Sequence, residues 1–159
     1  MEIAKGLVET LKIICRCFAD ADITFCLVGG LAVGMLSKPR ATEDIDLLVL
    51  IGEEDIRRIM EMLGERLSIV KMPEIMHFKK ASIQRILFKD TVSAADGFVI
   101  LDILFADNDV YKDALKDLTF VTIDDTPIPV PTRKNLLNIK RLSGRPQDIL
   151  DIEALMVEE

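Results

Sequence analysis

The sequence predicts an α/β protein of the α+β kind, with a mixed β-sheet flanked by helices. Apolar residues recur at helical spacing near the N-terminus, and several later runs of four to nine residues are rich in β-branched and aromatic residues. These runs are joined partly through helical segments and partly by tight turns. Helical crossovers favour parallel strand pairs and tight turns favour antiparallel ones, so the sheet is expected to be mixed.

The first half of the chain alternates helical and extended patterns. Apolar side chains at the spacing of one helix face mark the N-terminal helix, and Gly29-Gly30 follows a short strand-like run and opens a second helix. Glu53-Glu54-Asp55 places acidic residues where the first turn of a helix favours them. The expected elements are a helix over 3–19, a strand over 23–28, a helix over 29–36, a strand over 46–51 and a helix over 53–67.

The second half is less regular, and the segment over 69–90 carries only one clear strand pattern. Asp96-Gly97 is a strong turn signal, and Asp124-Asp125-Thr126 fits the turn of a hairpin. Pro146 suits the first position of a helix. The expected elements are strands over 82–88 and 98–105, a helix over 108–118, a hairpin over 120–130, and helices over 132–142 and from 146 on.

Length and composition predict a single domain over 1–159, with a C-terminal helical segment over about 132–157. Half of the 159 residues are hydrophobic and 30% are charged, a balance typical of globular proteins. The formal charge of −7 disfavours a broad nucleic-acid-binding or anionic-membrane surface.

No apolar run approaches the roughly 18 residues of a membrane span, and the N-terminus lacks the pattern of a signal peptide. A cytoplasmic protein is expected. Cys15, Cys17 and Cys26 are expected to be reduced, mostly core thiols, and the single histidine, His77, is expected to be a structural or surface residue rather than a catalytic one.

The most informative motif pairs Gly29-Gly30 with Asp44-Ile45-Asp46, at the head of an apolar run. Glycines between a strand and a helix allow close approach to the backbone, and a helix N-terminus favours anions. Alternation along a strand puts Asp44 and Asp46 on one face. Two carboxylates so close repel each other unless a cation lies between them, so the motif predicts a metal-dependent phosphate site.

Asp102 is the third acidic candidate, because it stands within the otherwise apolar run over 98–105. An ionised carboxylate buried without a partner costs several kcal/mol. A divalent cation shared with Asp44 and Asp46 would provide that partner, if the two strands are neighbours. The alternative is that Gly29-Gly30 only permits a tight turn, Asp44 caps a strand and Asp102 forms a buried ion pair with a lysine or arginine.

The glycine pair, Asp44-Ile45-Asp46 and Asp102 resemble, in order and spacing, the signature of the nucleotidyltransferase superfamily, whose minimal fold is shared with DNA polymerase β. Nearly the whole chain from residue 23 on is similar to stand-alone bacterial members, which include toxin-type proteins of abortive-infection toxin–antitoxin systems. The similar segments are 27–32, 40–46 and 131–136, with Lys140, Arg145, Asp148 and Asp151.

The resemblance implies a nucleotidyltransferase fold with C-terminal helices packed on the core. It also implies that a nucleoside triphosphate (NTP) donates a nucleoside monophosphate to a hydroxyl acceptor, which could be a protein, an RNA or a small molecule. Gly29 and Gly30 would hold the phosphates. Asp44, Asp46 and Asp102 would be the catalytic and metal-binding residues, sharing two Mg²⁺ ions.

Three further residues are candidates for the donor site. Arg40 and Thr42 closely precede the acidic pair, so they could reach the phosphates, although a loop arginine is often only solvated. Lys140 could contact phosphates, or it could join Arg145, Asp148 and Asp151 in an ion network without chemistry.

Leu31 departs from the resemblance, because many active members carry a hydroxyl residue directly after the glycine pair. A core position in the short helix would explain Leu31 equally well. The acceptor is not identified by the sequence, although the segment over 71–80 could help to bind it or could be ordinary surface. An antitoxin or other protein is a candidate partner, and a non-catalytic nucleotide-binding or partner-binding module is the alternative function.

Overall fold

The computed structural model describes residues 5–37, 44–92 and 97–157. Its larger sheet is mixed, with strand order β1-β2-β6-β5-β3 and β4 paired to β5. β2 and β6 are parallel, and the other pairs are antiparallel. The strands are β1 (Phe25–Val28), β2 (Asp44–Val49), β3 (Ile69–Lys71), β4 (Met76–His77), β5 (Ser82–Asp90) and β6 (Gly97–Phe105).

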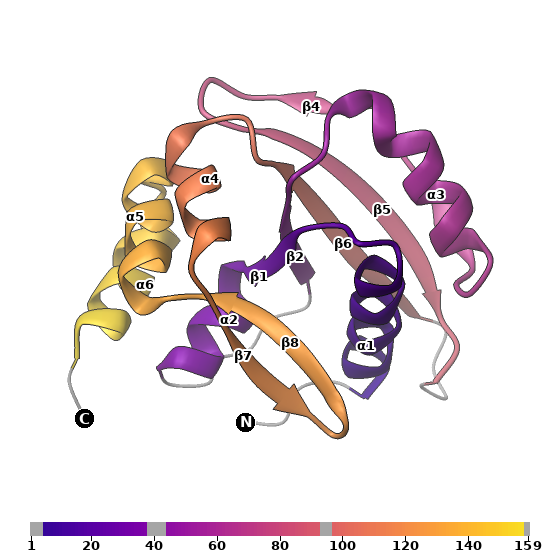
Figure 1. Cartoon of the computed structure of the whole chain (residues 1–159), viewed down its shortest axis with the longest axis horizontal. Coiled ribbons are helices and arrows are strands. Elements are labelled where there is room, and N and C mark those ends of the chain that lie inside the picture. The colour runs from indigo at the N-terminus through magenta and orange to yellow at the C-terminus, as the bar shows by residue number, and fades with distance from the viewer. Residues whose placement is uncertain (1–4, 38–43, 93–96, 158–159) are drawn as a thin grey trace.

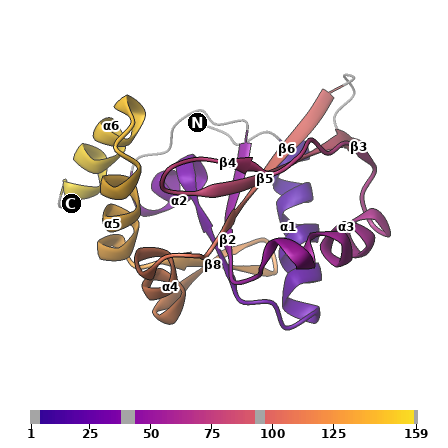
Figure 2. The ribbon, with the colours of Figure 1, turned by 90° about the horizontal axis from the view of Figure 1, so that it is seen from above.

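The helices lie on both sides of this sheet, as the fold class predicted. α1 and α3 lie together at one side of the molecule, and α4, α5 and α6 lie at the opposite side (Figure 1), an arrangement that the view from above in Figure 2 repeats. The helices are α1 (Lys5–Asp20), α2 (Gly29–Leu36), α3 (Ile56–Gly64), α4 (Asp109–Lys116), α5 (Arg133–Ser143) and α6 (Pro146–Met156), and a 3₁₀ turn over Glu53–Asp55 precedes α3.

Much of the core lies between α1, α3 and the face of the sheet that they cover, and buried residues of α2, α4, α5 and β8 belong to the same cluster. Leu11, Ile14 and Phe18 occupy one side of α1 and are at most 1% exposed, which confirms the helix expected from their spacing. Phe18 also meets Phe25 of β1 edge to face, with ring centroids 5.3 Å apart. Because β6 alternates, Leu101 and its neighbours two and four positions on face this core, whereas Asp102 points to the other face.

The hairpin expected near residue 124 is confirmed. β7 (Leu118–Ile123) and β8 (Thr126–Pro131) form a separate two-stranded sheet, and Asp124 adopts a positive φ of 52° in its turn. Lys12 of α1 donates a hydrogen bond to the Asp124 carboxylate at 2.7 Å. This hydrogen bond holds the turn of the hairpin against α1.

The short strands β3 and β4 were not predicted. They have three and two residues, which is too short for an alternating pattern to show, and their pairing with β5 defines them instead. β2 begins two residues before the predicted strand, so Asp44 lies within it. None of the described helices has the length and apolar character needed to cross a membrane.

Candidate active site

Two neighbouring strands bring the three predicted carboxylates together. Asp44 and Asp46 stand on β2, and the parallel register of β2 and β6 places Asp46 directly beside Asp102, with Asp44 beside Ile100. Ile45 between the two aspartates is fully buried, so the aspartates share the opposite face. The prediction that these strands are neighbours is confirmed.

Gly29 brings the start of α2 against the same carboxylates. Its φ is +70°, a conformation that favours glycine. A Cβ added at Gly29 would overlap the Asp46 side chain, with the Asp46 carboxyl carbon only 2.8 Å away. Val28, which precedes α2, offers no side-chain cap, and no acidic residue occupies the first turn of this helix. The structure therefore places the glycine turn directly against Asp46, at the N-terminus of a helix.

Asp102 forms an ion pair with a residue that the sequence interpretation did not name. Arg85 of β5 lies opposite Asp102 in the antiparallel register, and it donates two hydrogen bonds to the carboxylate. Arg85 Nε lies 2.8 Å from Oδ1, and a terminal guanidinium nitrogen lies 2.9 Å from Oδ2. The Asp102 side chain is 9% exposed and that of Arg85 is 39% exposed. Asp102 therefore forms a buried ion pair with an arginine, which is the alternative to metal binding that the sequence left open.

A signal for Arg85 was present in the sequence. Arg85 interrupts the apolar alternation of one predicted strand just as Asp102 interrupts the other, and the Asp96-Gly97 turn predicts that two such strands can form a hairpin. Two lone, opposite charges on adjacent apolar strands are expected to meet. The register, which the sequence does not reveal, sets Asp90 against Gly97 and therefore Arg85 against Asp102.

Among the three aspartates of the site, Asp46 has a clearly raised pKa. Burial and, after it, the neighbouring charges of Asp102 and Asp44 raise the pKa of Asp46, the charges of Lys140 and Arg145 lower it, and the net result is a pKa of about 7. The carboxylate cluster therefore favours a cation or a proton near neutral pH. Arg145 is the more accessible of the two basic residues, with its side chain 72% exposed.

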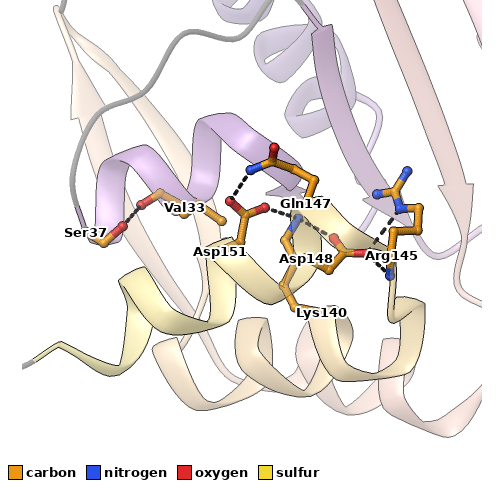
Figure 3. A network of polar contacts seen from close by, with 7 residues as sticks. All are labelled: Val33, Ser37, Lys140, Arg145, Gln147, Asp148 and Asp151. Atoms are coloured by element: carbon orange, nitrogen blue, oxygen red, sulfur yellow. Dashed lines mark hydrogen bonds and ion pairs between the residues drawn. The ribbon is translucent and has the colours of Figure 1, made fainter.

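Lys140 is held in a buried ion network that joins α5 to α6 (Figure 3). Its ammonium group lies 3.2 Å from Asp148 and 3.0 Å from Asp151, and all three side chains are at most 5% exposed. Arg145 donates a backbone and a side-chain hydrogen bond to Asp148, and Gln147 donates one to Asp151. These are the contacts of the ion-network alternative, and a phosphate contact by Lys140 stays a prediction.

The remaining predicted residues fall into two groups. Arg40 and Thr42 lie outside the described residues. Leu31 is 3% exposed and packs in the core, which is the structural explanation for a leucine after the glycine pair. Cys15, Cys17 and Cys26 are free and buried, as predicted, and burial raises the pKa of the Cys15 and Cys26 thiols to about 12.

The carboxylate pair on β2 suits a hard divalent cation such as Mg²⁺. Both ligands are oxygen donors on one strand face, and a cation would relieve the repulsion that helps to raise the pKa of Asp46. Within the described part of the chain, no three His, Cys, Asp or Glu side chains are grouped closely enough to hold a metal ion. Asp102 is also paired with Arg85, whose positive charge compensates that of the carboxylate.

A cavity of about 410 Å³ opens at one end of the two strands that carry Arg85 and Asp102. It lies between the β4–β5 turn, the segment that follows β6 and the end of α5, and part of the segment over 71–80 contributes to it. The lining residues are Phe78, Lys79, Lys80, Ala81, Ser82, Asp107, Asn108, Asp109, Val110 and Leu142.

Solved structures of nucleotidyltransferase-like proteins resemble this chain over almost its whole length. A candidate nucleotidyltransferase from Thermotoga maritima is 17% identical with a TM-score of 0.66, covering 96% of this chain and 93% of that chain. An antigenic nucleotidyltransferase-like protein from Paracoccidioides brasiliensis is 17% identical with a TM-score of 0.64, covering 96% and 76%. A lincosamide antibiotic adenylyltransferase, solved with lincomycin bound, is 19% identical with a TM-score of 0.55, covering 98% of both chains.

No protein-family profile and no curated protein matches the sequence. At these identities the structural matches establish the fold. The chain therefore has the nucleotidyltransferase fold, as the sequence predicted.

Proposed function

We propose that this protein is a Mg²⁺-dependent nucleotidyltransferase that moves a nucleoside monophosphate from an NTP to a hydroxyl acceptor. The observation that carries the proposal is the position of Asp46, which stands between Asp102 on β6 and Gly29 at the start of α2. The glycine turn that is predicted to bind phosphates thus lies beside the carboxylate cluster. The nucleotidyltransferase fold of the chain supports the same reaction type.

The donor's phosphates would lie against the start of α2. Backbone N–H groups at a helix N-terminus favour anions, and glycine leaves room for a phosphate to approach the main chain. The exposed guanidinium of Arg145, whose charge acts on Asp46, could reach the same phosphates. Arg40 and Thr42, which closely precede Asp44 in the sequence, are predicted to contact the phosphates as well.

Asp44 and Asp46 would hold the metal, and Asp102 would act on the acceptor hydroxyl. Bound Mg²⁺ supplies a Lewis acid that neutralises the charge developing on the phosphates, and two such ions are predicted. Asp102 would accept the proton of the acceptor hydroxyl. The acceptor oxygen then forms a bond to the α-phosphorus as the bond to the β-phosphate oxygen breaks, and pyrophosphate leaves.

The acceptor would approach from the cavity at the end of β5 and β6. The loop after β6 that lines this cavity begins only a few residues beyond Asp102, and the lining combines apolar and charged side chains. Its volume falls within the usual range of small-molecule sites, about 300–1,000 Å³. A hydroxyl-bearing acceptor, and a toxin role with an antitoxin partner, are predictions that rest on the resemblance.

The test is transfer of label from NTPs carrying a radioactive α-phosphate, in the presence of Mg²⁺ and extract from the source cells. Wild type should transfer label and release pyrophosphate, and Asp44→Ala should reduce the rate by at least about a hundredfold because it removes a metal ligand. Asp113→Ala is the matched control, because Asp113 is an exposed residue of α4. Equal transfer by wild type and Asp44→Ala would overturn the assignment.

A second candidate is a nucleotide-binding module without turnover. The observation that favours it is the Arg85–Asp102 ion pair, which occupies the proposed proton acceptor. This candidate predicts Mg²⁺-dependent NTP binding that Asp44→Ala abolishes, with no release of pyrophosphate by wild type. Equilibrium binding measured beside the transfer assay separates the two functions.

A further inference from the structure

We infer that Arg85 is a positioning residue that sets how strongly the carboxylate site binds divalent metal. The inference rests on the proposed function, because it concerns the metal that this function requires. In the present arrangement the guanidinium supplies the positive charge that Asp102 needs. Metal must therefore bind beside Arg85 or displace it from Asp102.

The geometry shows how completely Arg85 engages Asp102. A carboxylate offers about four lone-pair positions on its two oxygens, and a bidentate guanidinium uses one on each oxygen. Arg85 makes both of these bonds, at 2.8 and 2.9 Å. Asp102 can then offer an ion one remaining lone pair at a time, and it cannot chelate through both oxygens on the side that Arg85 occupies.

Charge adds to this steric effect. Arg85 interacts electrostatically with Asp44 and Asp46 as well as with Asp102, so its guanidinium lies within the field of the whole carboxylate cluster. A divalent cation at Asp44 and Asp46 would be repelled by it. Because Arg85 comes from β5 and its side chain is more exposed than that of Asp102, it is the partner that can turn outward to solvent.

The arrangement gives Arg85 two effects that oppose each other. In metal-free protein it prevents an uncompensated charge at Asp102, which would destabilise the fold. When metal binds, it competes for Asp102. Neutralising Arg85 should therefore weaken the metal-free protein and strengthen metal binding.

The experiment titrates purified protein with Mn²⁺ without nucleotide, at one mildly alkaline pH, and follows free Mn²⁺ by electron paramagnetic resonance. Affinity should rise in the order wild type, Arg85→Lys, Arg85→Gln. Lysine keeps the charge but loses the bidentate geometry, and glutamine loses both. Arg85→Gln should bind at least about tenfold more tightly than wild type, because the repelling charge is gone. Arg58→Gln, which changes an exposed arginine of α3, should leave the affinity unchanged.

A second readout is thermal unfolding. In EDTA, Arg85→Gln should melt below wild type, and Mn²⁺ should raise its melting temperature more than that of wild type. The gain in Mn²⁺ affinity should also shrink in the background of Asp102→Asn, because competition for that carboxylate is then absent and only the charge repulsion is relieved. If Arg85→Gln does not fold, Arg85→Lys carries the test.

Equal or weaker Mn²⁺ binding by Arg85→Lys and Arg85→Gln would overturn the inference while leaving the proposed function standing. A gain that persists undiminished with Asp102→Asn would overturn it as well. If neither wild type nor any Arg85 variant bound Mn²⁺, the metal-dependent function would fail, and the inference would fall with it.

Discussion

At the scale of single residues, the site depends on the contact between Gly29 and Asp46. Gly29 provides a positive φ and leaves the space that the Asp46 carboxylate fills. The glycine pair and the acidic pair, which are separate motifs in the sequence, are therefore one packing unit in the fold. A change at either position should affect the other.

Gly29→Ala tests this contact. Alanine at positive φ costs about 1–2 kcal/mol, and its Cβ would displace Asp46. We expect loss of Mg²⁺-dependent NTP binding together with lower stability, measured by calorimetric titration and chemical denaturation. Gly144→Ala is a matched control, because Gly144 also has a positive φ but its added Cβ would meet no atom closer than 3.9 Å. Equal effects of the two changes on binding would contradict the account.

Asp46 should make stability depend on pH. Its pKa of about 7 in the folded protein lies above the ordinary value near 4, so the folded state keeps a proton that the unfolded chain releases. Stability from this group is complete below about pH 4 and is lost as the pH rises toward about 7.

The measurement compares wild type with Asp46→Asn in EDTA by denaturant unfolding across this range. The amide mimics the protonated carboxyl, so the variant should gain about 1–3 kcal/mol relative to wild type between about pH 4 and 8, since the side chain is half-buried. Saturating Mg²⁺ should abolish the gain. If the difference in free energy of unfolding between the two proteins did not change with pH, the pKa of Asp46 would not be raised in the folded state.

At the scale of elements, the buried ion network around Lys140 stabilises the packing of α5 against α6. Burial raises the pKa of Asp148, but hydrogen bonds with Ser143 and Arg145 and the charge of Lys140 outweigh it and hold this pKa at about 2. A lowered carboxyl pKa stabilises the fold above the ordinary value and ceases to do so as the pH falls from about 4 to about 2. The network is therefore at full strength at neutral pH.

Lys140→Met separates the two roles that the sequence left open for this lysine. Removing the ammonium group takes away the cation that Asp148 and Asp151 share, so the free energy of unfolding should fall by about 3–5 kcal/mol. Lys134→Met, at an exposed position of the same helix, should change it little. Unchanged stability with weaker NTP binding would instead assign Lys140 to the phosphates.

At the scale of the whole molecule, the sequence predicted the parts of the fold that have strong local patterns. The amphipathic spacing of α1, the apolar run of β6 and the glycine turn before α2 each carry such a pattern, and each element formed near its expected position. β3 and β4 are defined by pairing rather than by composition, so no local pattern marked them.

In the candidate site too, some residues carry a local sequence pattern and others are defined only by contacts distant in the sequence. Asp44, Asp46 and Asp102 could be selected because they are charges at the head of, or inside, apolar strands, and the β2–β6 register brings them together. Arg85 and the buried position of Lys140 depend on strand register and helix packing, which arise from contacts distant in the sequence. The contribution of Arg40 and Thr42 lies outside the described residues and stays a prediction.

The central claim is that Asp44 and Asp46 hold the metal of an NTP whose phosphates lie on Gly29 and Gly30. The most direct measurement is a crystal structure with Mn²⁺ and a non-hydrolysable NTP analogue, using anomalous scattering to locate the ion. The account predicts an anomalous peak bound by both carboxylates, with the triphosphate against the start of α2. Mn²⁺ bound elsewhere, or a triphosphate distant from Gly29, would contradict it.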